Sequence, residues 1–167
     1  MSGGSRSRWG WYRLSDGAAR RLVAEAGIEP GQLVLDLGAG DGALTRQLVA
    51  AGAQVMAVEL HAERADALRR ALPGVKVVSC SLEDFRLPRR SFRVVANLPF
   101  AHSSMVIRRL LDSRMTRAHL VVPVQVAQRW TGRRPDRCSY RRLPRSAFQP
   151  AAPVPTAVLT VGRRRRR

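Results

Sequence analysis

The sequence has few of the residues that would mark a secreted, membrane-spanning or metal-binding protein. Only two of its 167 residues are cysteines, and the wide separation of Cys80 and Cys138 shows no metal-ligand spacing. The three histidines, His61, His102 and His119, also lack such spacing. No apolar stretch is long enough to span a bilayer, and no apolar segment of the signal-peptide kind follows the N-terminus. We therefore expect a soluble cytoplasmic protein with reduced thiols and no metal.

Acidic side chains are also scarce. Twelve Asp and Glu residues stand against 30 Lys and Arg residues, so the formal net charge at pH 7 is +18. A field of this sign attracts polyanions, and nucleic acid is the first candidate. A basic protein on a membrane surface is the competing class. The length of 167 residues and the hydrophobic share of 45% are sufficient for one domain with a real core.

A glycine-rich stretch, residues 36–42, lies between an apolar run at 33–35 and a segment with helical spacing at 43–49. Glycines at the turn let the backbone lie against a ligand, and the helix N-terminus favours an anionic group. Glu59 ends the next apolar run, about 20 residues further on, where a carboxylate can accept hydrogen bonds from two ribose hydroxyls. The pattern predicts nucleoside binding. The alternative is a loop that merely turns the chain.

Apolar runs and helical patterns alternate along the rest of the chain. Helices are expected from Asp16, as the cap, to Gly27, after Glu59 as far as Pro73, and from a cap at Ser103 or Ser104. Strands are expected at 33–35, 55–58, 75–78, 92–96, 119–122 and 156–161. This alternation predicts an α/β fold, with a mostly parallel sheet covered by helices on both faces. The basic segment 129–145 shows no legible pattern and is expected to be irregular.

The two ends of the chain are rich in arginine. We expect residues 1–8 to be a flexible basic segment, residues 9–162 to form the folded catalytic domain, and residues 163–167 to be a disordered arginine tail.

A second motif, Asn97-Leu98-Pro99-Phe100, follows the strand expected at 92–96. The Asn97 side-chain carbonyl and the Leu98 backbone carbonyl can accept both hydrogens of an exocyclic amine and aim its nitrogen lone pair. Pro99 stiffens the turn, and Phe100 offers a face on which a flipped-out base can stack. Methyl transfer from a sulfonium to such an amine needs positioning rather than a strong base. The alternative is an ordinary turn with a buried Phe.

Together, these two motifs resemble those of the rRNA adenine N6-methyltransferases, a family that includes the Erm macrolide-resistance enzymes and the small-subunit dimethyladenosine transferases. The resemblance runs from Trp9 to Val161. Residues 36–45 are similar to the family's S-adenosylmethionine loop, and Val58-Glu59-Leu60 is similar to its ribose-binding strand end.

The resemblance also assigns roles to individual residues. Asn97 to Phe100 match the family's catalytic motif, and Phe148-Gln149-Pro150 resembles its Phe-x-Pro segment, in which Phe148 forms the other wall of the adenine pocket. The implied catalytic residues are Asn97, Leu98, Pro99, Phe100 and Phe148. The implied cofactor-binding residues are Tyr12, Leu14, Asp36, Gly38, Gly40, Glu59, Leu60, Ser81 and Asn97.

Four features depart from the family pattern. Trp11-Tyr12-Arg13 replaces a Gln-Asn-Phe or Gln-His-Phe sequence that contacts the methionine part of the cofactor, although Leu14 is retained. Ser81 stands where the family has an Asp that binds the cofactor's adenine amine, and whether Ser81 or Asp84 makes this contact is left open. The segment 130–148 looks too short for the usual pair of late strands. No separate helical C-terminal domain is expected, as in a subset of mycobacterial Erm proteins.

The resemblance implies a Rossmann-like methyltransferase fold and S-adenosylmethionine as cofactor. It implies methylation of N6 of an adenine in 23S rRNA, once or twice, and macrolide resistance. The expected partner is RNA, as 23S rRNA or a ribosomal precursor, and a monomer is expected. The alternative is a weakly active or non-catalytic RNA-binding protein on this fold, which Ser81 and the short late segment favour and which Gly38, Gly40, Glu59 and Asn97 oppose. A methyltransferase for a small molecule is disfavoured, because such a substrate would not account for the net charge of +18.

Overall fold

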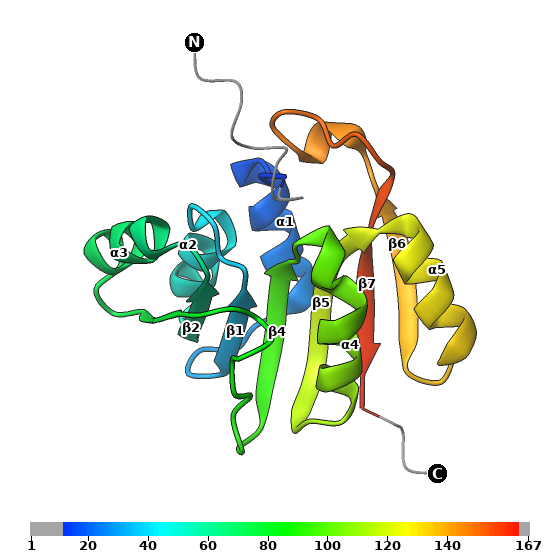
Figure 1. Ribbon diagram of the computed structural model, residues 1–167, viewed down its shortest axis with the longest axis horizontal. Coiled ribbons are helices and arrows are strands. Elements are labelled where there is room, and N and C mark those ends of the chain that lie inside the picture. Colours follow the sequence, from blue (N-terminus) through cyan, green and yellow to red (C-terminus); the bar gives the residue numbers. More distant parts are fainter. Residues whose placement is uncertain (1–11, 164–167) are drawn as a thin grey trace.

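A seven-stranded sheet with the order β3-β2-β1-β4-β5-β7-β6 forms the centre of the computed structural model (Figure 1). The structure describes residues 12–163, so the predicted segment 1–8 and most of the arginine tail lie outside it. The strands are β1 Leu33–Leu37, β2 Gln54–Glu59, β3 Lys76–Ser79, β4 Phe92–Asn97, β5 Met115–Pro123, β6 Cys138–Leu143 and β7 Thr156–Gly162. Strands β1 to β5 are parallel, and β7 is antiparallel to both β5 and β6.

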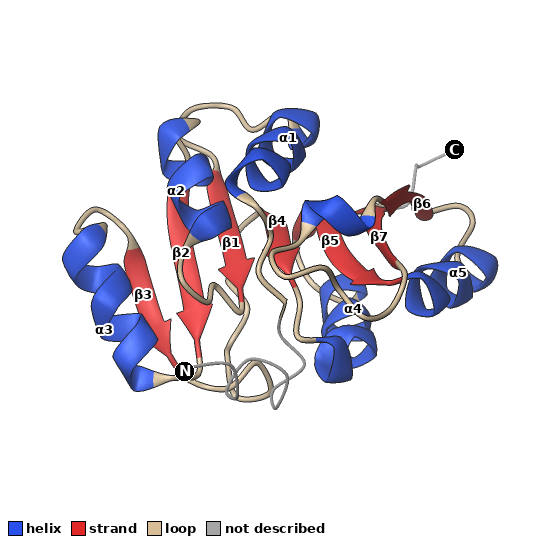
Figure 2. Ribbon diagram, turned by 90° about the horizontal axis from the view of Figure 1, so that it is seen from above, coloured by secondary structure: helices blue, strands red, loops and turns tan. Residues whose placement is uncertain are grey.

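Helices cover both faces of this sheet, as the sequence predicts. They are α1 Asp16–Ala26, α2 Ala43–Ala50, α3 Ala62–Ala71, α4 Ser103–Leu111 and α5 Val124–Arg133, with 3-10 turns η1 Phe100–His102 and η2 Arg145–Ala147. Helices α1 and α2 lie on one face, and α4 and α5 lie on the other (Figure 2). The central strand β1 is buried along its whole length, as its unbroken apolar run requires. Among the described residues, no helix combines the length and apolarity needed to cross a membrane.

Three local expectations are corrected. Helix α1 is capped by Ser15, whose Oγ accepts a hydrogen bond from the Ala18 N–H at 3.1 Å, and Asp16 is the first helical residue. Helix α4 begins at Ser103 without a side-chain cap. The irregular segment expected at 129–145 is wrong, because α5 extends to Arg133 and β6 pairs with β7. Both late strands are therefore present.

Candidate active site

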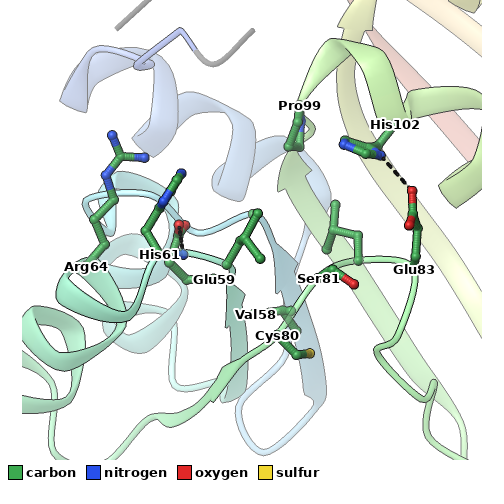
Figure 3. A pocket seen from close by; sticks show the side chains of 12 residues that line it. Val58, Glu59, His61, Arg64, Cys80, Ser81, Glu83, Pro99 and His102 are labelled. Carbon is green, nitrogen blue, oxygen red and sulfur yellow. Dashed lines mark hydrogen bonds and ion pairs between the residues drawn. The ribbon is translucent and has the colours of Figure 1, made fainter. Parts of the chain in front are cut away.

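The carboxyl ends of β1, β2 and β4 meet at one edge of the sheet, and a cavity of about 280 Å³ opens there. The strand order reverses between β1 and β4, which is where open parallel sheets bind ligands. A volume close to the roughly 300 Å³ of the smallest typical ligand pockets suits a nucleoside. In Figure 3, His61 and Arg64 form one wall, and Pro99 and His102 form the opposite wall.

The glycine loop lines the cavity at Gly38 and is held close to the end of β2. The N–H groups of Gly38 and Ala39 both donate to the Val58 carbonyl, at 2.8 and 3.0 Å. Gly38 has a φ of 80°, and a Cβ added to it would lie 3.0 Å from the Pro99 Cδ. Only glycine therefore lets the loop pass this close to the Asn97 motif. The two motifs singled out in the sequence share a wall of one cavity.

Glu59 ends β2 and lines the cavity, although it is only 4% exposed. One carboxylate oxygen, Oε2, accepts a hydrogen bond from the Gly40 N–H at 2.7 Å, and Oε1 accepts one from the His61 N–H at 3.0 Å. Each oxygen keeps a second lone pair for a ligand hydroxyl. Leu60 lines the same wall although it is 57% exposed, which offers an apolar surface to a planar ring.

The segment that follows β3 also lines the cavity. Ser81 lines the cavity, donates its hydroxyl to Asp84 at 2.9 Å and accepts the Asp84 N–H at 3.1 Å. Glu83 also lines the cavity, with an oxygen 3.6 Å from Nδ1 of His102. These two hydrogen bonds with Asp84 fix the orientation of the Ser81 hydroxyl. The sequence motifs assign neither Glu83 nor His102 a role in the site.

Asn97, the only asparagine in the chain, is the last residue of β4 and is 7% exposed. Its Nδ2 donates a hydrogen bond of 2.6 Å to the backbone carbonyl of Tyr12. The Tyr12 ring lies against Phe100, with 5.5 Å between ring centroids and an interplanar angle of 38°. The structure therefore brings Tyr12, Asn97 and Phe100 together beside the Pro99 wall.

Several predicted site residues do not line the cavity, namely Tyr12, Leu14, Asp36, Gly40, Asn97, Leu98, Phe100 and Phe148. Leu14 and Phe148 pair through a β-bridge and are each 2% exposed, so the role of Phe148 as a pocket wall stays a prediction. Leu98 packs in the core. Asp36 lies behind the glycine loop and accepts the Thr45 hydroxyl at 2.7 Å. Burial and the nearby Glu59 carboxylate raise the pKa of Asp36 to about 7.

A doubly wound sheet with this loop, this acidic strand end and this Asn-Leu-Pro-Phe motif defines the fold of the S-adenosylmethionine-dependent methyltransferases. The chain matches the ribosomal RNA adenine dimethylase family over residues 12–161, and it belongs to that family.

Named relatives agree with this assignment. An rRNA methyltransferase of Streptomyces thermotolerans is 33% identical over 162 residues, which cover 87% of this chain and 54% of the relative. The mycinamicin-resistance protein MyrB of Micromonospora griseorubida is 32% identical over 176 residues, covering 96% and 57% of the two chains. The chain thus spans about half the length of these curated relatives.

Solved structures show the same fold. The crystal structure of the 23S rRNA methyltransferase ErmE matches with a TM-score of 0.79 at 24% identity, covering 93% of this chain and 70% of that one. A dimethyladenosine transferase from Plasmodium falciparum matches with a TM-score of 0.77 at 21% identity, covering 90% and 62%. Because both sequence identities are below 25%, these matches establish the fold alone.

Proposed function

We propose that this chain transfers a methyl group from S-adenosylmethionine to N6 of an adenine in 23S rRNA, giving mono- or dimethyladenosine, and thereby contributes to macrolide resistance. The observation that carries the proposal is the contact between the glycine loop and the Asn97 motif. Gly38 and Pro99 belong to one cavity wall, so a nucleoside held at the loop lies next to the group that would hold the acceptor amine.

The cavity residues fit the cofactor. Glu59 can accept hydrogen bonds from the ribose hydroxyls with the lone pairs that Gly40 and His61 leave available. Leu60 and Leu82 offer apolar surface to the adenine, and Ser81 lies in the same wall for its polar edge. When bound, the cofactor supplies an electrophilic methyl group on a sulfonium.

The Asn97 motif would hold the acceptor. Because the Tyr12 carbonyl binds Nδ2 of Asn97, the Oδ1 atom of the same amide remains an acceptor for an N–H of the target adenine. The Leu98 backbone carbonyl takes the second N–H, and the rings of Phe100 and Tyr12 stack on the base. These contacts position the amine and exclude water, which is the main contribution required when no base is needed.

RNA as substrate is supported by the charge of +18 and by the family. A 23S rRNA methyltransferase and a mycinamicin-resistance protein stand among the matches, which favours the large-subunit RNA and a resistance role. We place the reaction in the cytoplasm, with 23S rRNA or a ribosomal precursor as substrate and a monomer as the active form. The alternative is an RNA-binding protein of this fold without turnover.

The deciding experiment is methyl transfer from S-adenosylmethionine onto 23S rRNA, followed by mass spectrometry of the digested nucleosides. The wild-type chain should produce N6-methylated adenosine. Asn97→Ala should lower the transfer rate by about 100-fold or more and leave cofactor affinity nearly unchanged, because the amine contact matters mainly in the transition state. Cofactor and RNA binding without a methylated base would favour the non-catalytic alternative, and a folded chain that binds no cofactor would overturn the proposal.

A further inference from the structure

The segment 12–15, here called the strap, connects three parts of the site that are far apart in sequence. Its Tyr12 carbonyl accepts the hydrogen bond from Asn97 at 2.6 Å. Its Arg13 carbonyl accepts one from the Gln149 N–H at 3.0 Å, and its Ser15 N–H donates to the Ala147 carbonyl at 2.8 Å. The strap therefore lies between the catalytic motif and the segment that precedes β7.

The Arg13 side chain ties the strap to the glycine loop. Its Nε donates to Oδ2 of Asp41, which lies in the loop next to Gly40. Its Nη2 donates to Oδ1 of Asp16 at 2.9 Å, and its Nη1 donates to the Leu14 carbonyl at 3.0 Å. A planar guanidinium can serve these three acceptors together, whereas a lysine ammonium on a flexible stem cannot hold the same fork.

The orientation of the Asn97 amide depends on this segment. A carboxamide can rotate by about 180° and exchange its oxygen and its NH₂ group. A backbone carbonyl accepts but cannot donate, so the Tyr12 carbonyl selects the rotamer in which NH₂ faces the strap and Oδ1 faces away. If the strap moves, the amide is free to present NH₂ to the substrate amine, where donor would meet donor.

We infer that Arg13 is a positioning residue, whose ion pair with Asp41 holds the strap against the glycine loop so that the Tyr12 carbonyl orients Asn97 for methyl transfer. The inference rests on the proposed function for its catalytic consequence. The contacts themselves belong to this chain, because Tyr12-Arg13 stands where the family resemblance places different residues. Through Arg13, the position of the glycine loop is coupled to the orientation of the Asn97 amide.

The test compares Arg13→Gln with the wild-type chain in three measurements. The turnover number at saturating RNA and cofactor should fall by about 3- to 10-fold. This loss is larger than that expected from removing an exposed ion pair alone and smaller than that expected when a catalytic group is displaced. The cofactor dissociation constant, measured by calorimetry, should change by less than about 2-fold, because Arg13 does not line the cavity. Amide exchange should become faster in segments 12–15 and 145–150.

Three further variants separate positioning from general destabilisation. Glu25→Gln removes another ion pair of α1, the one with Arg141, and should leave turnover unchanged. Arg13→Lys should restore part of the turnover. Asp41→Asn should also lower turnover, and the double variant should be no worse than Arg13→Gln alone, because Arg13→Gln already removes the contact with Asp41.

The outcomes distinguish this inference from the proposed function. If the wild-type chain methylates RNA and Arg13→Gln turns over at the wild-type rate, Arg13 has no positioning role and the proposed function stands. If the wild-type chain does not methylate RNA, the proposed function fails, and the exchange measurement still reports whether Arg13 holds the strap. Unchanged exchange in Arg13→Gln would overturn the link between the ion pair and the strap.

Discussion

Asp36→Asn should stabilise this protein, and the gain should depend on pH. Asp36 is 1% exposed in β1, directly behind the glycine loop. Its oxygen accepts the Thr45 hydroxyl at 2.7 Å, a bond that an asparagine oxygen can also accept. Burial, reinforced by the carboxylates of Glu59 and Asp41, raises its pKa from 3.8 to about 7 although the Thr45 hydroxyl opposes the shift. The substitution removes a charge that the folded state disfavours.

The sign and size of the effect follow from proton linkage. Because the pKa of Asp36 is higher in the folded chain, its contribution to stability is complete below pH 3.8 and is lost as the pH rises to about 7. At 1.36 kcal/mol per pH unit, the loss is at most about 4 kcal/mol above pH 7 and about 1.5 kcal/mol at pH 5. Asparagine does not titrate, so its advantage over Asp36 should grow by about 2–3 kcal/mol between pH 5 and pH 8.

Urea unfolding followed by circular dichroism at about pH 5 and about pH 8, without cofactor, measures this difference. Comparing two pH values removes any constant effect of how well asparagine packs. Asp112→Asn, at the exposed C-terminal end of α4, controls for the loss of one negative charge from a strongly basic chain. An equal stability change for Asp36→Asn at both pH values would refute the assignment of a raised pKa to this carboxyl.

Three further substitutions or deletions test the site. Glu59→Ala should weaken S-adenosylmethionine binding by about 1–3 kcal/mol in calorimetry, and an unchanged affinity in a folded variant would remove Glu59 from the site. Gly38→Ala should lower stability by about 1–3 kcal/mol in thermal unfolding, because the φ of 80° disfavours alanine and the new Cβ would crowd the Pro99 ring. Gly74→Ala is the control and should not lower stability, because the space around Gly74 is open. Deleting residues 163–167 should weaken RNA binding and flatten its salt dependence without changing the preferred adenine. If the full and truncated chains lose RNA affinity with salt at the same slope, the tail makes no phosphate contacts.

The parallel part of the sheet could be predicted from the sequence because its strands are continuous apolar runs. Strands covered on both faces need such runs, and β1 and β4 have them. The edge strand β6 could not be predicted in this way. In β6, Cys138 and Tyr140 alternate toward one core cluster and Leu143 packs against the other, but Arg141 and Arg142 are exposed, so the hydrophobic pattern is too short to distinguish from a basic loop.

Much of the candidate site was also predictable, because strand ends and glycine turns have sequence signatures. Gly38, Glu59, Leu60, Ser81 and Pro99 line one cavity, as residues at the ends of adjacent strands should. The side-chain contacts that refine the site have no such signature. The pairing of His102 with Glu83 depends on how two loops approach each other in space, and no local sequence pattern encodes that distance.

The same geometry separates substrate binding from chemistry. In the Asn97 motif, Asn97 and Leu98 are buried, and the motif packs against Gly38 and the Tyr12 carbonyl. Most of the surplus positive charge lies on arginines elsewhere in the chain, including the exposed Arg142 on the edge strand β6. Under the proposed function, contacts of arginines with phosphate would set affinity for any RNA, whereas contacts with the base would select the adenine. Changes to the arginines should therefore alter how tightly RNA is held, and changes at Asn97 or its strap should alter how fast it is methylated.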